Sequence, residues 1–322
     1  MNRHVLLLAL AALVSSGAAT AGAQSAAPAG PTLQERLGYP ASARLLIIHA
    51  DDFGMSHSVN RAIIDAFEHG WITSASLLVP CPWFAEAATW ARAHPDADLG
   101  IHLALNSEWT TVRWGPISGR DEVPSLLDAH GYLPLLEGEV VRNAKPKDVE
   151  RELRAQIDFA RAAGVRITHL DTHMGTVVRT EPMFKVYLGL GKSYNLPQLL
   201  THQVENGSPP APAWMAPSMK DALLDRMLEI GPGVPPEQWL DAYEKMLATL
   251  PPGVYQLVVH LAYDDEEMRG ATADHPDWGA AWRQHDIDMV KSDAFHAFLK
   301  QQGFQLVTWR ELSRKGLTTA LR

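Results

Sequence analysis

Two adjacent carboxylates, Asp51 and Asp52, stand where an apolar segment ends, and they point most directly to chemistry in this chain. The segment Leu45–Ile48 is typical of a buried strand, and a Phe53-Gly54 turn follows the two acids. At the carboxyl end of a parallel strand, such acids point into the crevice where α/β folds bind ligands. Neighbouring carboxylates there can divide two tasks, because one can bind a metal while the other moves a proton.

Histidines mark the ends of three further strand-like segments. They are His102, His173 and His260, and each closely follows a short apolar run. In a barrel of parallel strands these ends converge on one face. One Asp and two His form a suitable ligand set for a catalytic divalent metal, with positions left open to water and substrate. One such histidine alone would be interpreted as a core or surface residue, but the combination favours a shared site.

Strand-like and helix-like segments alternate from residue 44 onwards and must position these groups. Strands are predicted at 44–50, 73–79, 99–105, 165–170, 254–261 and 304–307. A helix capped by Ser56 is predicted to end near Gly70, and further helices at 83–93, 148–163, 182–191, 219–229, 236–249 and 284–302. Such alternation implies a parallel sheet covered by helices. The number of units favours an irregular (β/α) barrel of the TIM type, with mostly parallel strands, over an open sheet.

Two long stretches, 106–147 and 200–218, interrupt this rhythm, and loops of such length are usually functional or disordered. Their tryptophans, which include Trp109, Trp114 and Trp214, have two interpretations. They could stack on a sugar ring, or they could form a small apolar cluster within the loops themselves.

Composition excludes some classes of partner. The chain has a formal net charge of −9 and contains no basic run, which argues against nucleic acid and anionic lipid surfaces. The single cysteine, Cys81, excludes an intramolecular disulfide and is predicted to be a small core residue. The sequence leaves the oligomeric state open.

The N-terminal segment, residues 1–23, is typical of a signal peptide. Arg3 is followed by the apolar run Val5–Val14 and then by small residues up to Ala23. The run is too short to span a bilayer, so we expect no membrane span in the mature chain. Residues 24–38 are predicted to be a disordered lead-in and residues 39–322 a single domain. Export without disulfides fits a bacterial periplasm or the cell exterior.

The order of these motifs resembles the YdjC-like carbohydrate deacetylases, which include the chitooligosaccharide and hopanoid-associated deacetylases. Ala50–Gly54 followed by Asn60 resembles their opening motif, and residues 100–105 resemble their G-x-H-L-x-L segment. Residues 169–173 resemble their H-x-D-x-H segment, although Met174 then follows where further histidines are common. Residues 260–263 resemble their H-P-G-Y motif with Leu-Ala in its centre. Arg283 with Asp286 resembles an arginine-containing element before the last helix, and the resemblance covers residues 44 to about 312.

This resemblance implies an irregular (β/α) barrel and metal-dependent removal of acetyl groups from N-acetylated sugars or short oligosaccharides. Carried over by position, Asp52, His102 and His173 would be the ligands of one divalent metal ion. Asp51 would be the general base and His260 the general acid.

The residue types suit this chemistry independently of the resemblance. Hydrolysis of an amide needs a strong nucleophile, and a divalent metal supplies one by lowering the pKa of bound water, to about 7 in the zinc case. A carboxylate beside the metal ligand can accept the proton of that water, and a histidine can protonate the leaving amine. Asp with two His accepts zinc, and open water positions accept magnesium, so the identity of the metal stays open.

Four further residues are candidates for supporting roles. Asp171 is in phase with His173 and could orient a ligand histidine, and His49 is in phase with Asp51 but could equally be a buried barrel residue. Arg283 is either a clamp for substrate or carboxylate or part of a structural ion pair. Tyr263 is a candidate for contact with the substrate.

Two other functions remain open. A metal-dependent esterase or another amidohydrolase could use the same site, because O-acetyl and N-acetyl groups present similar carbonyls. A non-catalytic periplasmic sugar-binding protein would need the fold and the sugar contacts, but it would not need Asp51 beside a metal ligand.

Overall fold

The computed structural model describes residues 31–202, 211–219 and 222–314, which belong to one compact unit that begins at Pro31. Among these residues the strands are β1 (Arg44–Phe53), β2 (Ser74–Leu77), β3 (Leu99–Leu103), β4 (Ile167–Thr172), β5 (Arg226–Leu228), β6 (Gly253–Val259) and β7 (Phe304–Leu306). The α-helices are α1 (Leu33–Arg36), α2 (His57–Glu68), α3 (Phe84–Ala93), α4 (Glu137–Asn143), α5 (Pro146–Ala162), α6 (Glu181–Tyr194), α7 (Ala216–Met219), α8 (Trp239–Ala248), α9 (Glu266–Ala271), α10 (Ala280–Val290), α11 (Asp293–Gln301) and α12 (Trp309–Arg314). Short 3₁₀ helices are η1 (Pro124–Leu126), η2 (His173–Val178), η3 (Pro236–Gln238) and η4 (Pro276–Trp278).

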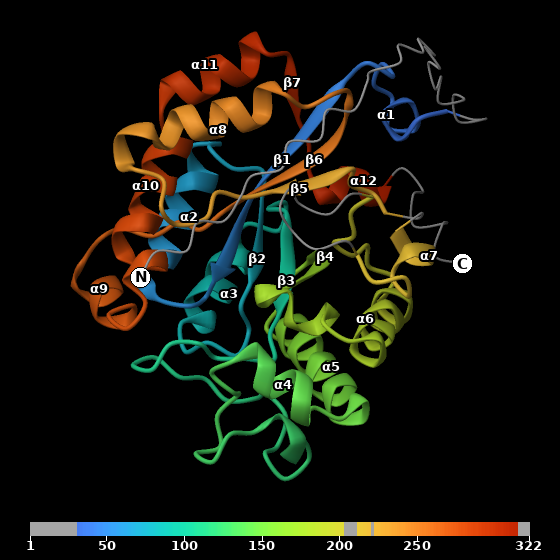
Figure 1. Cartoon of the computed structure of the whole chain (residues 1–322), viewed down its shortest axis with the longest axis vertical. Helices are drawn as coiled ribbons and strands as arrows, with labels where there is room; N and C mark the ends of the chain where they lie inside the picture. Colours follow the sequence, from blue (N-terminus) through green and yellow to red (C-terminus); the bar gives the residue numbers. More distant parts are fainter. Residues whose placement is uncertain (1–30, 203–210, 220–221, 315–322) are drawn as a thin grey trace, which may run out of the picture. The chain divides into compact units, whose positions relative to one another are not determined.

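The strands form a parallel sheet in the order β4-β3-β2-β1-β6-β5, and β7 pairs beside the start of β1 (Figure 1). The chain after α6 approaches both edges of this sheet. Gln198 forms a parallel bridge to Leu170 of β4, and Thr201 forms one to Leu224, just before β5. The sheet therefore curls into an irregular, partly open barrel, which confirms the predicted fold class.

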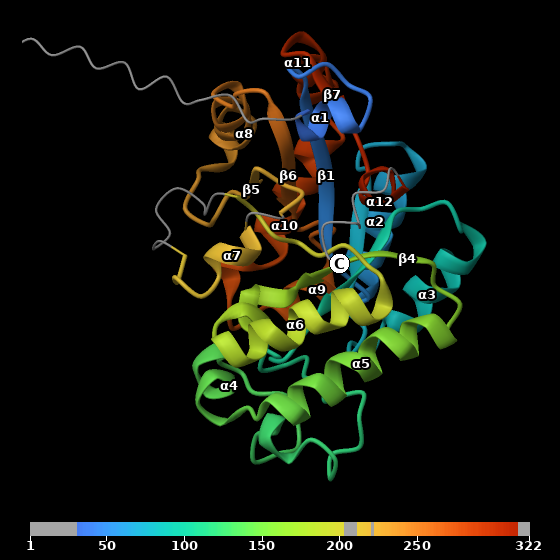
Figure 2. The same cartoon turned by 90° about the vertical axis from the view of Figure 1, so that its right-hand side faces the viewer.

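Helices cover the outer face of the strands. Figure 1 shows α8, α10 and α11 together beside the β1 and β6 end, and both views show α5 and α6 side by side (Figure 2). Alternate residues of β1, such as Leu46 and Ile48, face outwards and pack in the larger apolar core with Val59 and Ile63 of α2. Ser56 caps α2 through the amide of Val59, as its position in the sequence predicts.

The inner face of the barrel changes from apolar to polar along β1. Leu45 and Ile47 join Val254 and Trp309 in a second apolar cluster, which forms the floor of the barrel. The next two inward residues are His49 and Asp51, so polar side chains occupy the interior from the middle of the strand to its carboxyl end. Layers of inward side chains of this kind are the normal filling of a TIM-type barrel.

Three sequence predictions about these elements are wrong in detail. The predicted disordered lead-in 24–38 contains α1, and Leu37 after it is buried in the floor cluster; residues 24–30 lie outside the described part of the chain. The predicted helix 219–229 contains the strand β5, because main-chain pairing with β6 decides its structure. The predicted helix 284–302 is two helices, since Ser292 caps a new helix through the amide of Phe295.

The long stretch 106–147 folds against the barrel. Trp109 and Trp114 are each 2% exposed and belong to the larger core, so the apolar-cluster interpretation holds for both. Trp214, in the second stretch, is half-buried against Phe184, and residues 203–210 of that stretch lie outside the described part.

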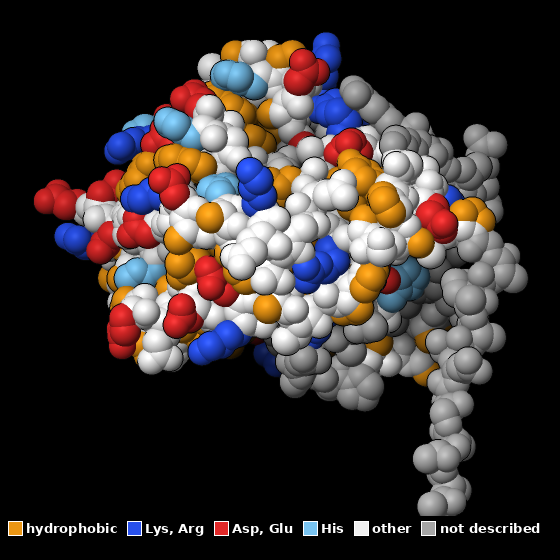
Figure 3. All heavy atoms as spheres, turned by 90° about the horizontal axis from the view of Figure 1, so that it is seen from above, with side chains coloured by type: hydrophobic (Ala, Val, Ile, Leu, Met, Phe, Trp, Pro, Cys, Tyr) orange, Lys and Arg blue, Asp and Glu red, His pale blue; other side chains and the backbone are white. Residues whose placement is uncertain are grey.

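The described surface bears on partners in two ways. On the face seen in Figure 3, acidic and basic side chains are interspersed. Among the described residues, no helix combines the length and apolar character needed to cross a bilayer.

Gly100 of β3 leaves room for a buried ring and provides a test of the barrel packing. A Cβ at this position would overlap the imidazole of His169, whereas nothing lies within 4 Å of a Cβ at Gly189, which is exposed in α6. We expect Gly100→Ala to lower the free energy of unfolding by about 1–3 kcal/mol through overpacking. The control Gly189→Ala should raise it by about 0.4–1 kcal/mol. Denaturant titration of both variants measures this, and equal stability of Gly100→Ala and the wild type would contradict the packing.

Candidate active site

The two adjacent aspartates at the end of β1 both enter the barrel because the backbone turns between them. In a regular strand, neighbouring side chains point to opposite faces. Here the pairing of β1 with β2 shifts register between Ala50 and Phe53, and Asp52 adopts a left-handed conformation with φ 67°. Asp is among the side chains that tolerate this conformation. The turn brings the Asp52 carboxylate to the same interior as that of Asp51.

Asp52 faces two histidines, and each of these histidines also contacts a second carboxylate. Its Oδ1 lies 3.7 Å from Nε2 of His102 and 3.5 Å from Nδ1 of His173. The other nitrogen of His102, Nδ1, donates to Asp171 Oδ1 at 2.9 Å, and Nε2 of His173 donates to Glu108 Oε2 at 2.8 Å. Each ring is therefore oriented so that its remaining nitrogen faces Asp52, the arrangement expected of metal-ligating histidines.

The second oxygen of Asp52 pairs with Arg283. The Arg283 guanidinium, which is buried, lies 2.8 Å from Asp52 Oδ2 and over the ring of Trp109. Of the two sequence interpretations of Arg283, the structure favours the ion pair, and the partner is a site carboxylate. The pairing leaves Oδ1 of Asp52 turned towards the histidines.

Electrostatics keep this cluster charged despite its burial. Burial alone would raise the pKa of Asp52, but Arg283 and His173 outweigh it and hold that pKa well below its usual range. Burial would lower the pKa of His173, but Glu108 and Asp52 raise it to about 10. Likewise Asp51 and Asp171 raise the pKa of His102 against the effect of burial. These shifts reflect ionised carboxylates gathered around imidazole rings.

The donor set fits a divalent cation. One oxygen of Asp52 and one nitrogen each of His102 and His173 lie within 4.8 Å of one another. Oδ1 of Asp52 is buried and has no hydrogen-bond partner among the described residues. Since buried polar atoms are normally satisfied, this oxygen is suited to bind a cation. A carboxylate oxygen with two imidazole nitrogens suits zinc and related ions.

His260 faces the same interior from the end of β6. Its Nε2 lies 3.8 Å from Asp51 Oδ2 and its Nδ1 lies 3.5 Å from Glu229 Oε1, while its ring packs against Trp282. Asp286 accepts a hydrogen bond from the main-chain amide of His260 and so fixes the end of the strand. Burial lowers the pKa of His260 to about 4, because Asp52 and Asp51 oppose it only in part.

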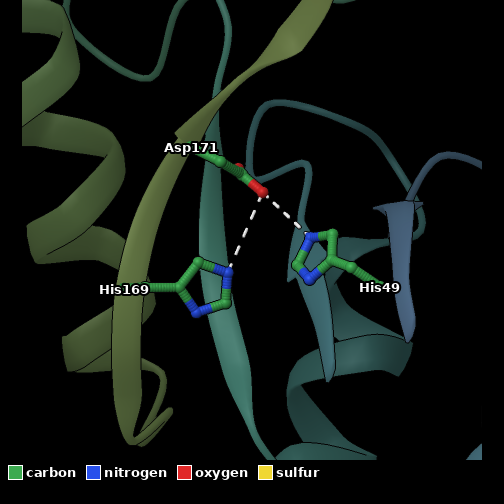
Figure 4. A group of neighbouring side chains, drawn as sticks. All are labelled: His49, His169 and Asp171. Carbon is green, nitrogen blue, oxygen red and sulfur yellow. Dashed lines mark hydrogen bonds and ion pairs between the residues drawn. The ribbon is translucent and has the colours of Figure 1, made fainter. Parts of the chain in front are cut away.

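Below the site, a second group of buried side chains joins β1 to β4. Figure 4 shows Asp171 between the rings of His49 and His169. Asp171 Oδ2 lies 2.9 Å from His49 Nε2 and 3.9 Å from His169 Nε2, and His49 Nδ1 lies 2.9 Å from Ser74 Oγ. Because Asp171 and Ser74 already engage His49, we interpret His49 and Asp171 as support for the site rather than as part of a second metal centre.

The predicted substrate contact of Tyr263 stays a prediction. Its hydroxyl donates to Asp65 of α2 at 2.5 Å, so the structure does not bring it into the cluster. The other predicted residues converge on one interior, mostly from strand ends, with Arg283 reaching it from α10. They are Asp51, Asp52, His102, His173, His260, Asp171, Arg283 and His49.

Sequence reasoning missed Glu108 and Glu229. Glu108 follows the end of β3 by five residues in the polar run Asn106-Ser107-Glu108, and a carboxylate so close to a strand end was the available signal. Glu229 directly follows β5, which sequence reasoning assigned to a helix, so its position at a strand end was hidden.

Comparison with known proteins places this geometry in context. A family model described as YdjC-like protein matches residues 45–301. The chain is 35% identical to a carbohydrate deacetylase of Thermus thermophilus over 283 aligned residues. The alignment covers 86% of this chain and 97% of that protein. It is 31% identical to a carbohydrate deacetylase of Halalkalibacterium halodurans, over 70% of this chain and 87% of that one. A crystal structure of a proposed cellobiose-phosphate cleavage protein from Enterococcus faecalis is similar with a TM-score of 0.70 and 25% identity, over 84% of this chain and 99% of that one.

Proposed function

This chain belongs to the YdjC-like family of carbohydrate deacetylases, and we propose that it hydrolyses the acetamide of N-acetylated sugars or short oligosaccharides with one divalent metal ion. The observation that carries the proposal is the convergence of Asp51, Asp52, His102 and His173 at the strand ends. Two adjacent carboxylates, one facing the histidines and the other beside them, are the groups that metal-assisted hydrolysis requires.

Asp52, His102 and His173 would hold the metal. A bound divalent ion would lower the pKa of a water molecule and polarise the acetyl carbonyl. Asp171 and Glu108 would keep the two histidines oriented, and Arg283 would keep Asp52 ionised with one oxygen free. Zinc and magnesium are both compatible with this ligand set.

Asp51 would act as the general base. Its Oδ2 lies 3.6 Å from His102 Nε2, beside the proposed ligands without being one of them. From there it can accept the proton of the water that attacks the acetyl carbonyl carbon.

His260 would protonate the departing amine. Its low pKa means that its ring is neutral in the resting protein at pH 7, so the proton that it delivers must reach it during turnover. Asp51 Oδ2, at 3.8 Å from His260 Nε2, is a suitable source once it has taken the proton of the water. The proton would then pass from His260 Nε2 to the nitrogen of the breaking C–N bond.

Two expectations outside the site accompany this proposal. The chain would be exported to the periplasm or the cell exterior, which rests on the signal-like residues 1–23, outside the described part. Its partner would be an acetylated sugar, with oligomerisation left open.

Acetate release from a panel of N- and O-acetylated sugars tests the proposal. After chelation, we expect release from N-acetylated sugars to disappear and to return when zinc, magnesium or manganese is added back. Release from O-acetyl substrates alone would favour an esterase, and binding without release would favour a sugar-binding protein. Either result would contradict N-deacetylation.

The roles of the two aspartates can be separated by metal content. Asp51→Asn should retain the metal and lower kcat by about 10²–10⁴-fold, because it removes a base and no ligand. His173→Ala should lose the metal, and the exposed Asp96→Asn serves as the control. Metal analysis of purified protein together with kinetics decides the question. If Asp51→Asn lost the metal as His173→Ala does, the two aspartates would exchange roles.

The role of His260 can be tested with two leaving groups. An amine must be protonated as it departs, whereas the phenolate of an aryl acetate leaves unaided. We therefore expect His260→Ala to slow N-deacetylation far more than aryl acetate hydrolysis, with metal content unchanged. His275→Ala, an exposed histidine packed against Trp109, is the control. Equal losses on both substrates would show that His260 is not the acid.

A further inference from the structure

We propose that His49 is a positioning residue that holds the Asp51 carboxylate in its working orientation, an inference that rests on the proposed role of Asp51 as the base. His49 and Asp51 are two residues apart on β1, so both face the barrel interior, one directly below the other. His49 is completely buried, and Figure 4 shows its ring turned towards Asp171 of β4.

Both ring nitrogens of His49 face acceptors. On one side, Nδ1 lies 2.9 Å from Ser74 Oγ, and Ser74 donates its own hydroxyl proton towards Asp98. Because that proton is engaged, Ser74 Oγ is available to accept a hydrogen bond from Nδ1. On the other side, Nε2 lies 2.9 Å from Asp171 Oδ2, 3.1 Å from Ser76 Oγ and 3.2 Å from Asp51 Oδ1.

The contact with Asp51 is an ion-pair contact rather than a regular hydrogen bond, and it bears on how Asp51 points. Oδ1 of Asp51 is buried and makes no regular hydrogen bond with the described residues, so His49 Nε2 is the polar group that compensates it. With Oδ1 held there, Oδ2 faces the nitrogens of His102 and His260. Oδ1 of Asp51 therefore contacts His49, and Oδ2 is left for proton transfer. Small displacements of a reacting group are costly, since about 1 Å can lower the rate roughly 10²-fold.

Asp171 connects this contact to the proposed metal ligands. One of its oxygens accepts from His102 and the other from His49, so a single buried carboxylate orients both a ligand and the residue that holds the base. His169 lies in the same buried group but contacts Asp98, Asp171 and Trp309 rather than Asp51, which makes it a matched control.

Two conservative substitutions separate positioning from mere support. In His49→Gln the amide nitrogen can replace Nε2 and reach Asp51, whereas in His49→Asn the shorter amide can replace only Nδ1 and reach Ser74. We expect His49→Asn to lower kcat by about 10–100-fold with KM and metal content unchanged, and His49→Gln to retain most of the activity. The control His169→Gln should keep the wild-type kcat. Circular dichroism establishes that each variant is folded.

The decisive result is the difference in kcat between His49→Gln and His49→Asn. Equal kcat losses in His49→Gln and His49→Asn, a loss of metal from either, or an equal loss in His169→Gln would overturn the proposal, since each indicates general damage to the buried group.

Crystal structures of the wild type and His49→Asn separate this inference from the proposed function. We expect the Asp51 carboxylate to leave its wild-type orientation in His49→Asn, and an unchanged Asp51 would overturn the positioning role even if the kinetics were altered. If the wild-type protein released no acetate, the proposed function would fail, but these two structures would still test the contact.

Discussion

The left-handed turn at Asp52 is the constraint on which the site depends. A regular strand would send Asp51 and Asp52 to opposite faces, one into the barrel and the other towards the helices. The left-handed conformation disfavours a residue with a Cβ by roughly 1–2 kcal/mol, so it must be held by its surroundings. The register shift against β2 and the ion pair with Arg283 hold it here. The turn brings the carboxylates of Asp51 and Asp52 to the same side of the sheet, where one strand end can supply both a proposed ligand and a proposed base.

The buried Asp52 carboxylate beside the half-buried Asp51 carboxylate creates a second constraint, because like charges in a weakly polar interior repel strongly. The chain meets it by giving each acid its own nitrogen partner. Arg283 faces one oxygen of Asp52, and His49 faces one oxygen of Asp51. The same pattern extends outwards, where Asp171 lies between His49 and His102. Alternation of acids and nitrogens neutralises the interior and leaves Oδ1 of Asp52 facing the nitrogens of His102 and His173.

How far the sequence predicts this structure depends on whether the signal is local. The strand ends that carry Asp51, His102 and His260 were predictable, because an apolar run that ends in a polar residue is a local pattern. The strand β5 was not, since its three residues form a strand through pairing with β6, and the apolar spacing around them is that of a helix. The contact of Glu108 with His173 joins residues 65 positions apart, and only the folded loop sets their distance.

That same contact joins a long loop to a proposed metal ligand. The segment 106–147 is the long insertion after β3, and from it Glu108 holds His173 while Trp114 packs against the same ring. Next to His173, the exposed Met174 adopts a left-handed conformation and contacts Asn106 of the insertion. This part of the insertion is therefore built around a proposed metal ligand. A change in this insertion that moves Glu108 would also alter the orientation of His173, so the loop and the proposed metal ligand are physically coupled in this fold.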